Sequence, residues 1–165
     1  EVGKLPLRIQ PLDLAAVIAR VVAAAAPHAW QAGRVTVAAQ PAPDLPLALA
    51  DEQRMEQILH NLVQNAVRHT PPGGLVAVSA ARSGAQIAVQ VRDTGSGIRA
   101  EDLPHIFDRY FQAQGSAARP TDGVGLGLAL VQEWTQAMGG SVHVASRVGE
   151  GSCFTVCVPA ERAGG

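Results

Sequence analysis

The stretch DEQRMEQILHNLVQNAVRHT, residues 51–70, combines helical periodicity with polar side chains suited to binding a ligand. Its apolar residues recur at the three- and four-residue spacing of an amphipathic helix, so we predict a helix with one buried face. The residues of that face are Met55, Ile58, Leu59, Leu62, Val63, Ala66 and Val67. We expect the rest of the fold to be arranged around this helix.

One border of the apolar face carries polar groups. At about 100° per residue, Asn61, Asn65 and Arg68 fall in a strip about 60° wide, with His69 just inside it. Carboxamide oxygens can ligate a hard cation such as Mg²⁺, and arginine suits phosphate oxygens. The strip indicates a site for a magnesium-bound phosphate chain. A solvated helix flank has the same composition, so this helix alone leaves both interpretations open.

The composition indicates a single globular domain. The chain has 165 residues, 47% apolar and 16% charged, which is enough for a sizeable core. A net charge of -1 and 4% aromatic residues argue against a nucleic-acid-binding protein. Cys153 and Cys157 fall in one expected strand, about 13 Å apart, which is too far for a disulfide. Reducing conditions and a cytoplasmic location fit this cysteine usage.

No membrane span is expected in the chain. The longest apolar run, residues 15–26, is interrupted by Arg20 and is too short to cross a bilayer. The chain starts at Glu1 without a methionine or a signal peptide, so we expect a piece of a longer protein.

Helix and strand patterns alternate along the chain. Asp13 is a suitable N-cap for a helix that runs to about Ala26 and ends at Pro27. A second amphipathic helix is expected at 123–138, and a short helical stretch at 101–107. The expected strands are 35–39, 47–50, 75–81, 87–91, 141–146 and 153–158, the third and fourth forming a hairpin. The pattern predicts the α+β class, a two-layer sandwich with helices on one face of a largely antiparallel sheet.

The segment VRDTGSGI, residues 91–98, places a carboxylate at the end of an apolar strand. Asp93 can accept a hydrogen bond from the exocyclic amine of adenine, and Gly95 and Gly97 allow the backbone to approach a flat ring. Guanine presents a carbonyl there, and two facing acceptors would cost about 1–3 kcal/mol, so Asp93 would also select the base. An aspartate followed by glycines is also a common turn, and that alternative stays open here.

The segment DGVGLGLALV, residues 122–131, places Gly123, Gly125 and Gly127 at the entrance to a helix. Backbone amides can wrap a phosphate there, and the helix dipole adds partial positive charge. Residues 108–122, between the glycine clusters, have the composition of a lid over a ligand or of an ordinary loop. Each motif is weak alone, but their order indicates one site.

The segments NLVQNAVRHT, DTGSGI, IFDRYF, GVGLGLALV and GEGSCFTV resemble, in that order, the N, first-glycine, F, second-glycine and third-glycine boxes of the catalytic ATP-binding domain of sensor histidine kinases. That domain has the Bergerat fold of the GHKL superfamily, shared with type II topoisomerases, Hsp90 and mismatch-repair ATPases. The resemblance covers about residues 5–159. It implies ATP and Mg²⁺ as cofactors and phosphoryl transfer to a histidine.

The resemblance also implies residue roles. Asn65 would be the magnesium ligand, and the catalytic residues would be Asn61, near the phosphates, and Arg109, which can reach the terminal phosphate. Phe107 and Phe111 resemble hydrophobic anchors of the lid. The remaining nucleotide contacts that it implies are Arg68, His69, Asp93, Gly95, Gly97, Ile98, Phe107, Gly123, Gly125, Leu126, Gly127 and Thr155.

None of the histidines is followed by an acidic residue, as a phosphoacceptor of this family would be. The resemblance therefore implies that residues 1–10 are a linker from an upstream dimerisation and phosphoacceptor domain, 11–160 the catalytic domain and 161–165 a tail. The expected partners are those upstream helices, in cis or in trans, a response-regulator receiver domain and a second copy in a homodimer. Neither nucleic acid nor direct membrane contact is expected, although the parent could be anchored in the inner membrane.

The identity of residue 61 helps to distinguish a kinase from an ATP-hydrolysing enzyme. In ATP-hydrolysing relatives a glutamate usually stands four residues before the metal-binding asparagine, and an amide cannot activate water as that glutamate does. Slow hydrolysis suits a kinase, because ATP must survive until a histidine attacks it. We therefore expect a protein histidine kinase domain. The alternatives are a serine/threonine kinase of the anti-sigma-factor type and a nucleotide-binding docking module without catalysis.

Overall fold

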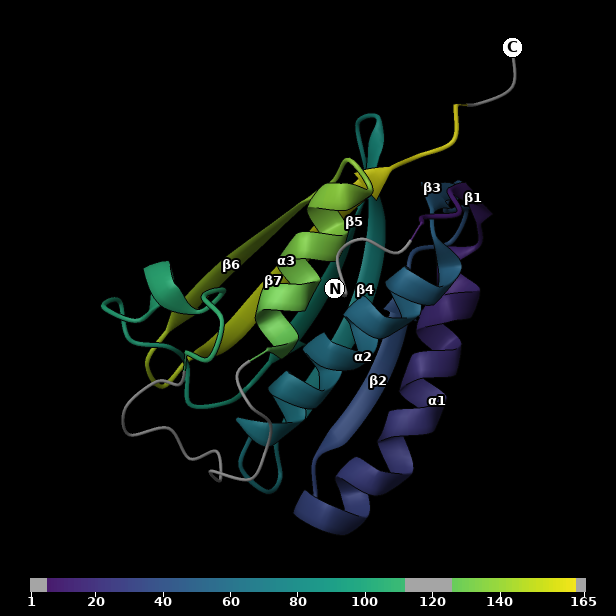
Figure 1. The fold of residues 1–165 in the computed structure, drawn as a ribbon. Helices are drawn as coiled ribbons and strands as arrows, with labels where there is room; N and C mark the ends of the chain where they lie inside the picture. Colours follow the sequence, from purple (N-terminus) through teal and green to yellow (C-terminus); the bar gives the residue numbers. More distant parts are fainter. Residues whose placement is uncertain (1–5, 112–125, 163–165) are drawn as a thin grey trace.

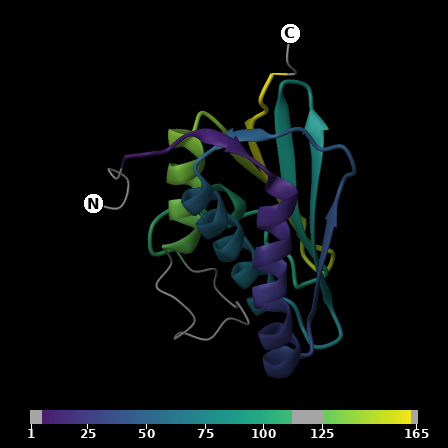
Figure 2. The ribbon, with the colours of Figure 1, turned by 90° about the vertical axis from the view of Figure 1, so that its right-hand side faces the viewer.

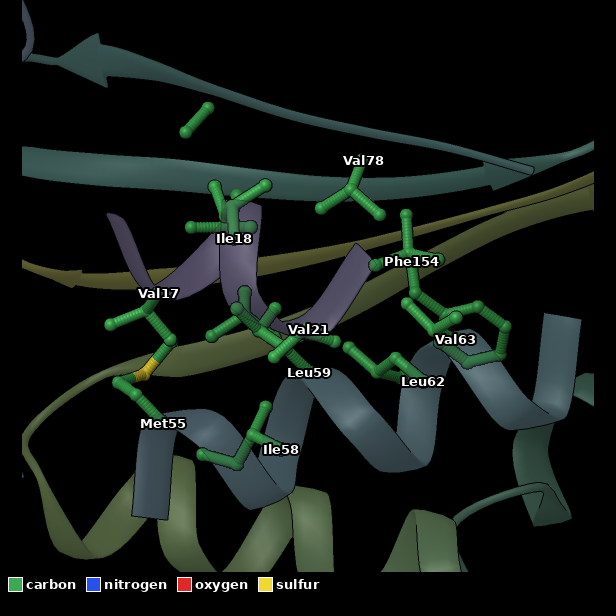
Figure 3. Packing of buried hydrophobic residues seen from close by; sticks show 14 of the residues in the cluster. Val17, Ile18, Val21, Met55, Ile58, Leu59, Leu62, Val63, Val78 and Phe154 are labelled. Carbon is green, nitrogen blue, oxygen red and sulfur yellow. The ribbon is translucent and has the colours of Figure 1, made fainter. Parts of the chain in front are cut away.

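The helix predicted within residues 51–70 is α2, Glu52–Arg68, at the centre of the helical layer (Figure 1). The computed structural model describes residues 6–111 and 126–162. Asp51 caps α2, its Oδ1 accepting a hydrogen bond from the N–H of Arg54 at 3.0 Å. The predicted apolar face is buried from Met55 to Ala66, and Val67 is partly buried against the same core. Figure 3 shows this face packed against α1 and the sheet.

The first helix, α1, spans Leu14–Gly33 and does not end at Pro27, as the sequence had predicted. Asp13 caps it as expected. Pro27 cannot donate a hydrogen bond to the carbonyl of Ala23, but both residues are exposed, so water can bond to that carbonyl. Beyond the proline, Ala29 is 2% exposed and packs in the core. The packing of the last turns therefore outweighs one lost hydrogen bond.

Because α1 continues through Pro27, it is longer than the apolar run at residues 15–26, which is too short to cross a membrane. Its 20 residues, with a mean hydropathy of 1.2, pass a test of length and composition for a spanning helix. A core helix passes the same test, and Val17, Ile18 and Val21 of α1 lie in the core cluster.

Five strands form the main sheet in the order β2-β4-β5-β7-β6. They are β2 (Thr36–Pro41), β4 (Leu75–Ser83), β5 (Gln86–Asp93), β6 (Ser141–Arg147) and β7 (Gly151–Pro159). All pairings are antiparallel except β2 with β4, which is parallel. A small second sheet pairs β1 (Gln10–Leu12) with β3 (Ala48–Ala50). The predicted hairpin is the pair β4–β5.

The helices cover one face of this sheet (Figure 2). The third helix, α3, spans Gly127–Ala137 and packs beside α2. The helical stretch predicted near 101–107 is a short 3₁₀ turn, η2, Leu103–His105. Val91 and its partner Phe154 face the helices, so Cys153 and Cys157 lie on the other face, and both are free thiols as predicted. The α+β two-layer sandwich is confirmed.

Candidate nucleotide-binding site

Asp93 is the last residue of β5 and is only 4% exposed. Its Oδ1 accepts a hydrogen bond from the N–H of Gly95 at 2.8 Å, which bends the chain into the turn that follows. Burial raises the pKa of this carboxyl, while the backbone N–H groups of Gly95 and Ser152 oppose the shift. A buried carboxyl with a raised pKa at a strand end is typical of a binding site.

The turn after Asp93 rests on the C-terminal end of α2. The N–H of Ser96 donates to the carbonyl of His69 at 3.2 Å. A Cβ on Gly95 would lie 2.4 Å from the same oxygen, so only glycine allows this close approach. The turn is thereby fixed against His69, which ends the polar strip of α2.

The loop between β6 and β7 supports the turn from the other side. Gly97 has a φ of 76°, and a Cβ there would lie 2.0 Å from the carbonyl oxygen of Arg147. Gly149 donates its N–H to the Ser96 carbonyl at 2.8 Å. The Ser146 Oγ accepts from the N–H of Ile98 at 2.8 Å. Sequence reasoning missed Ser146, because a serine in a strand carries no local signal of such a contact.

The opposite end of the strip meets the start of α3. The Asn61 Nδ2 donates a hydrogen bond to the carbonyl of Gly127, the first residue of α3, at 3.3 Å. The structure therefore brings together Asn61 and Gly127, which are 66 residues apart in the sequence. Leu126 precedes the helix and makes no side-chain cap, so it leaves the first N–H groups of α3 without a side-chain acceptor of its own.

Asn65 and Arg68 lie along α2 between the two ends, and both are half-buried. From Asn61 to His69 the axis of an α-helix rises by about 12 Å. One edge of α2 thus runs from the start of α3 to the turn that follows Asp93. A ligand lying along this edge would present one end to Asp93 and the other to the start of α3.

The donors of the site suit a magnesium ion that comes with a phosphate ligand. Within the described residues no group of three or more His, Cys, Asp or Glu side chains could hold a metal alone. Mg²⁺ is usually held by one or two protein oxygens together with phosphates and water, rather than by a full protein cage. A single carboxamide oxygen from Asn65, in the middle of the strip, fits that requirement.

The segment that carries Arg109 packs on the sheet through its aromatic residues. The Phe107 ring meets Phe154 edge to face, with centroids 6.2 Å apart, and the Phe111 ring lies 5.8 Å from that of His105. Both phenylalanines pack against the core, as anchors would. Arg109 forms an ion pair with Glu133 of α3.

Gly123 and Gly125, and most of the expected lid, lie outside the described residues. Among the described residues, the position of Thr155 does not support the prediction that it contacts the nucleotide. It pairs with Gln90 in β5, one residue out of phase with Phe154, so it faces away from the helices and from Asp93.

Known proteins of one family are similar to this chain in sequence. Residues 50–162 match the family described as "Histidine kinase-, DNA gyrase B-, and HSP90-like ATPase". The sensor protein DivL of Caulobacter vibrioides is 42% identical over 129 residues, which are 78% of this chain and 16% of DivL. The sensor-like histidine kinase SenX3 of Mycobacterium tuberculosis is 41% identical over 112 residues, 68% of this chain and 27% of SenX3.

Solved structures show the same architecture. The crystal structure of full-length ShkA in complex with AMPPNP superposes with a TM-score of 0.84 at 33% identity, over 98% of this chain and 33% of ShkA. The mycobacterial sensor histidine kinase MprB, at 22% identity and a TM-score of 0.80, shares the fold over 94% of this chain and 100% of the MprB chain. The chain spans less than a third of the length of DivL and SenX3.

Proposed function

This chain belongs to the family of histidine kinase-, DNA gyrase B- and HSP90-like ATPases, and on that premise we propose that it is the ATP-binding catalytic domain of a sensor histidine kinase. The domain would transfer the γ-phosphoryl group of ATP to a histidine on a separate dimerisation domain, for relay to a response regulator. The observation that carries the proposal is that one edge of α2 contacts both the start of α3 and the turn after Asp93.

At the base end, Asp93 would accept a hydrogen bond from the exocyclic amine of adenine. Its Oδ1 already accepts the N–H of Gly95, so the carboxylate is oriented before a ligand arrives. Gly95 and Gly97 bring the backbone close to His69 and Arg147, which leaves the turn rigid beneath a flat ring. Guanine would meet this carboxylate with its own acceptor, so the site would prefer adenine.

At the phosphate end, Asn65 would hold Mg²⁺, and Arg68 and the first N–H groups of α3 would bind phosphate oxygens. Mg²⁺, when bound, neutralises charge on the phosphates. The hydrogen bond from Asn61 to Gly127 fixes the start of α3 against α2. Asn61 also lacks the basic lone pair needed to activate water, so hydrolysis would be slow and the phosphoryl group would remain available to a histidine.

The domain layout and partners follow from the same proposal. Residues 1–10 would link this domain to upstream dimerisation helices, and residues 161–165 would form a tail. In support, the N–H of Arg8 donates to the Asp51 carboxylate at 2.8 Å, so the incoming chain is attached to the N-terminus of α2. The partners would be those helices, a receiver domain and a second copy of the protein, with the domain located in the cytoplasm.

The substitution Asn65→Ala tests the proposal. In the full-length parent protein we expect it to lower phosphohistidine formation by about ten- to a hundredfold, because removal of groups that support a bound metal has effects on that scale. Incorporation of labelled γ-phosphate into the parent measures this.

The matched control is Gln64→Ala, which removes a carboxamide from the adjacent, exposed position of α2. That variant should keep wild-type activity. Full phosphotransfer in Asn65→Ala would show that this side chain does not hold the metal, and would remove the phosphate end of the proposal.

A further inference from the structure

Arg109 and Glu133 form an ion pair between two different elements. Arg109 follows η2, whereas Glu133 lies in the second turn of α3. The arginine side chain is 55% exposed and the glutamate side chain 35% exposed. Solvent therefore reaches this pair, and an anionic ligand can compete for its guanidinium.

The backbone next to Arg109 is shaped for this contact. Tyr110 has a left-handed φ of 65°, which a tyrosine rarely adopts. The N–H of Phe111 donates to the carbonyl of Asp108 at 3.3 Å and closes a tight turn around Arg109. Phe111 also lies against His105, which holds the turn on the preceding segment. Local structure thus fixes the backbone of the turn from which the Arg109 side chain reaches Glu133.

Glu133 binds the Arg109 guanidinium from the second turn of α3 rather than from its first residue. Glu133 is six residues beyond Gly127, a rise of about 9 Å along the helix axis. The start of α3 is marked by the hydrogen bond from Asn61 to Gly127, where the proposed phosphate end of the site lies. An arginine that contacts a terminal phosphate there must loosen or leave its carboxylate partner.

A guanidinium binds carboxylate and phosphate oxygens with the same donors, so the two anions compete for it. We propose that Glu133 is a positioning residue that competes with the terminal phosphate of ATP for Arg109, and so sets how much more tightly the site binds ATP than ADP. This inference rests on the proposed function and on the role that the resemblance implies for Arg109, which is to reach the terminal phosphate. ADP lacks the terminal phosphate and does not draw Arg109 from Glu133, so the competition acts on the triphosphate alone.

The expected change in ATP affinity is small because the Arg109–Glu133 pair is exposed to solvent. Ion pairs as exposed as this one are weak, and losing the competitor should change an equilibrium by about two- to fivefold. Glu133 also repels any phosphate through its charge, which would affect ATP and ADP alike. The difference between the two nucleotides therefore separates competition for Arg109 from simple repulsion.

The experiment titrates the chain with Mg-ATP and with Mg-ADP in a calorimeter, for the wild type and Glu133→Gln. We expect Glu133→Gln to bind ATP about two- to fivefold more tightly and ADP with little change. Glu101→Gln removes the same charge at an exposed position outside α3 and should alter neither affinity. In an Arg109→Gln background, Glu133→Gln should no longer favour ATP, because the competing partner is gone.

Equal tightening for ATP and ADP, unchanged ATP affinity, or weaker ATP binding in Glu133→Gln would each overturn the inference. Equal tightening would mean that Glu133 only repels phosphates. Weaker ATP binding would mean that Glu133 supports Arg109 in its phosphate contact. In all three cases the wild type still binds Mg-ATP and the proposed function stands. A wild-type chain that binds no Mg-ATP would overturn the proposed function itself.

Discussion

The Asp93 carboxyl stabilises the folded chain less at neutral pH than in acid. Burial raises its pKa in the folded state above the usual 3.8, although the N–H groups of Gly95 and Ser152 act in the opposite direction. The folded state then binds the proton more tightly than the unfolded state does. Its contribution to the free energy of unfolding is therefore greatest below pH 3.8 and declines as the pH rises through the folded pKa. The ionised carboxylate is suited to ligand binding rather than to stability.

Two glycine substitutions test the contact between the turn and α2. In Gly95→Ala the new Cβ would lie 2.4 Å from the His69 carbonyl oxygen, so we expect the free energy of unfolding to fall by about 1–3 kcal/mol. Gly33→Ala places a Cβ 3.8 Å from Val35 in the last turn of α1, where alanine should stabilise by about 0.5–1 kcal/mol. Urea unfolding measures both. If the two variants were equally stable, the turn would not rest on α2.

Among the elements, α2 was the one best predicted from sequence, because its core and its polar edge are both local patterns of a 3.6-residue period. The Asp51 cap, the apolar face and the hairpin β4–β5 all follow from such patterns. The end of α1 could not be predicted in this way. A proline normally stops a helix, and only the packing of Ala29, which depends on the fold, carries α1 onward.

The account of α1 predicts opposite effects for two prolines. Pro27→Ala restores an N–H that can bond to Ala23, and we expect the free energy of unfolding to rise by about 1–3 kcal/mol. Pro43→Ala, in the turn before β3, should lower it by about 0.4–1 kcal/mol through greater freedom of the unfolded chain. Thermal unfolding of each variant measures the sign. A destabilised Pro27→Ala would mean that the proline is needed for the shape of α1.

At the scale of the whole molecule, the order of the sequence motifs predicted the α+β class and a single site. It did not predict the long-range contacts that bring the residues of that site together. The parallel pairing of β2 with β4, the support from Ser146 and the pair Arg109–Glu133 join residues far apart in the chain. Thr155 was misplaced because its face depends on the register of β7, which a motif does not reveal. Local patterns identify the parts, and tertiary contacts decide which parts meet.

Adenine is proposed to bind at Asp93, at one end of the polar edge of α2. Asp93→Asn tests this proposal directly. The amide oxygen of the new asparagine should accept the hydrogen bond from the N–H of Gly95. The NH₂ group then takes the place of the carboxylate oxygen that would face the ligand. An NH₂ group would oppose the amine of adenine and could donate to the carbonyl of guanine. The variant should remain folded, because the amide can keep the hydrogen bond from Gly95 and places no charge in the buried position.

Calorimetric titration with Mg-ATP and Mg-GTP provides the measurement. For the wild type we expect a strong preference for ATP. In Asp93→Asn we expect ATP affinity to fall by about tenfold or more, as an opposed buried hydrogen bond would cause, while GTP affinity does not fall. Asp13→Asn, which retains a good helix cap far from the site, should bind ATP like the wild type. Equal affinity of the wild type for both nucleotides, or unchanged ATP binding in Asp93→Asn, would contradict the account.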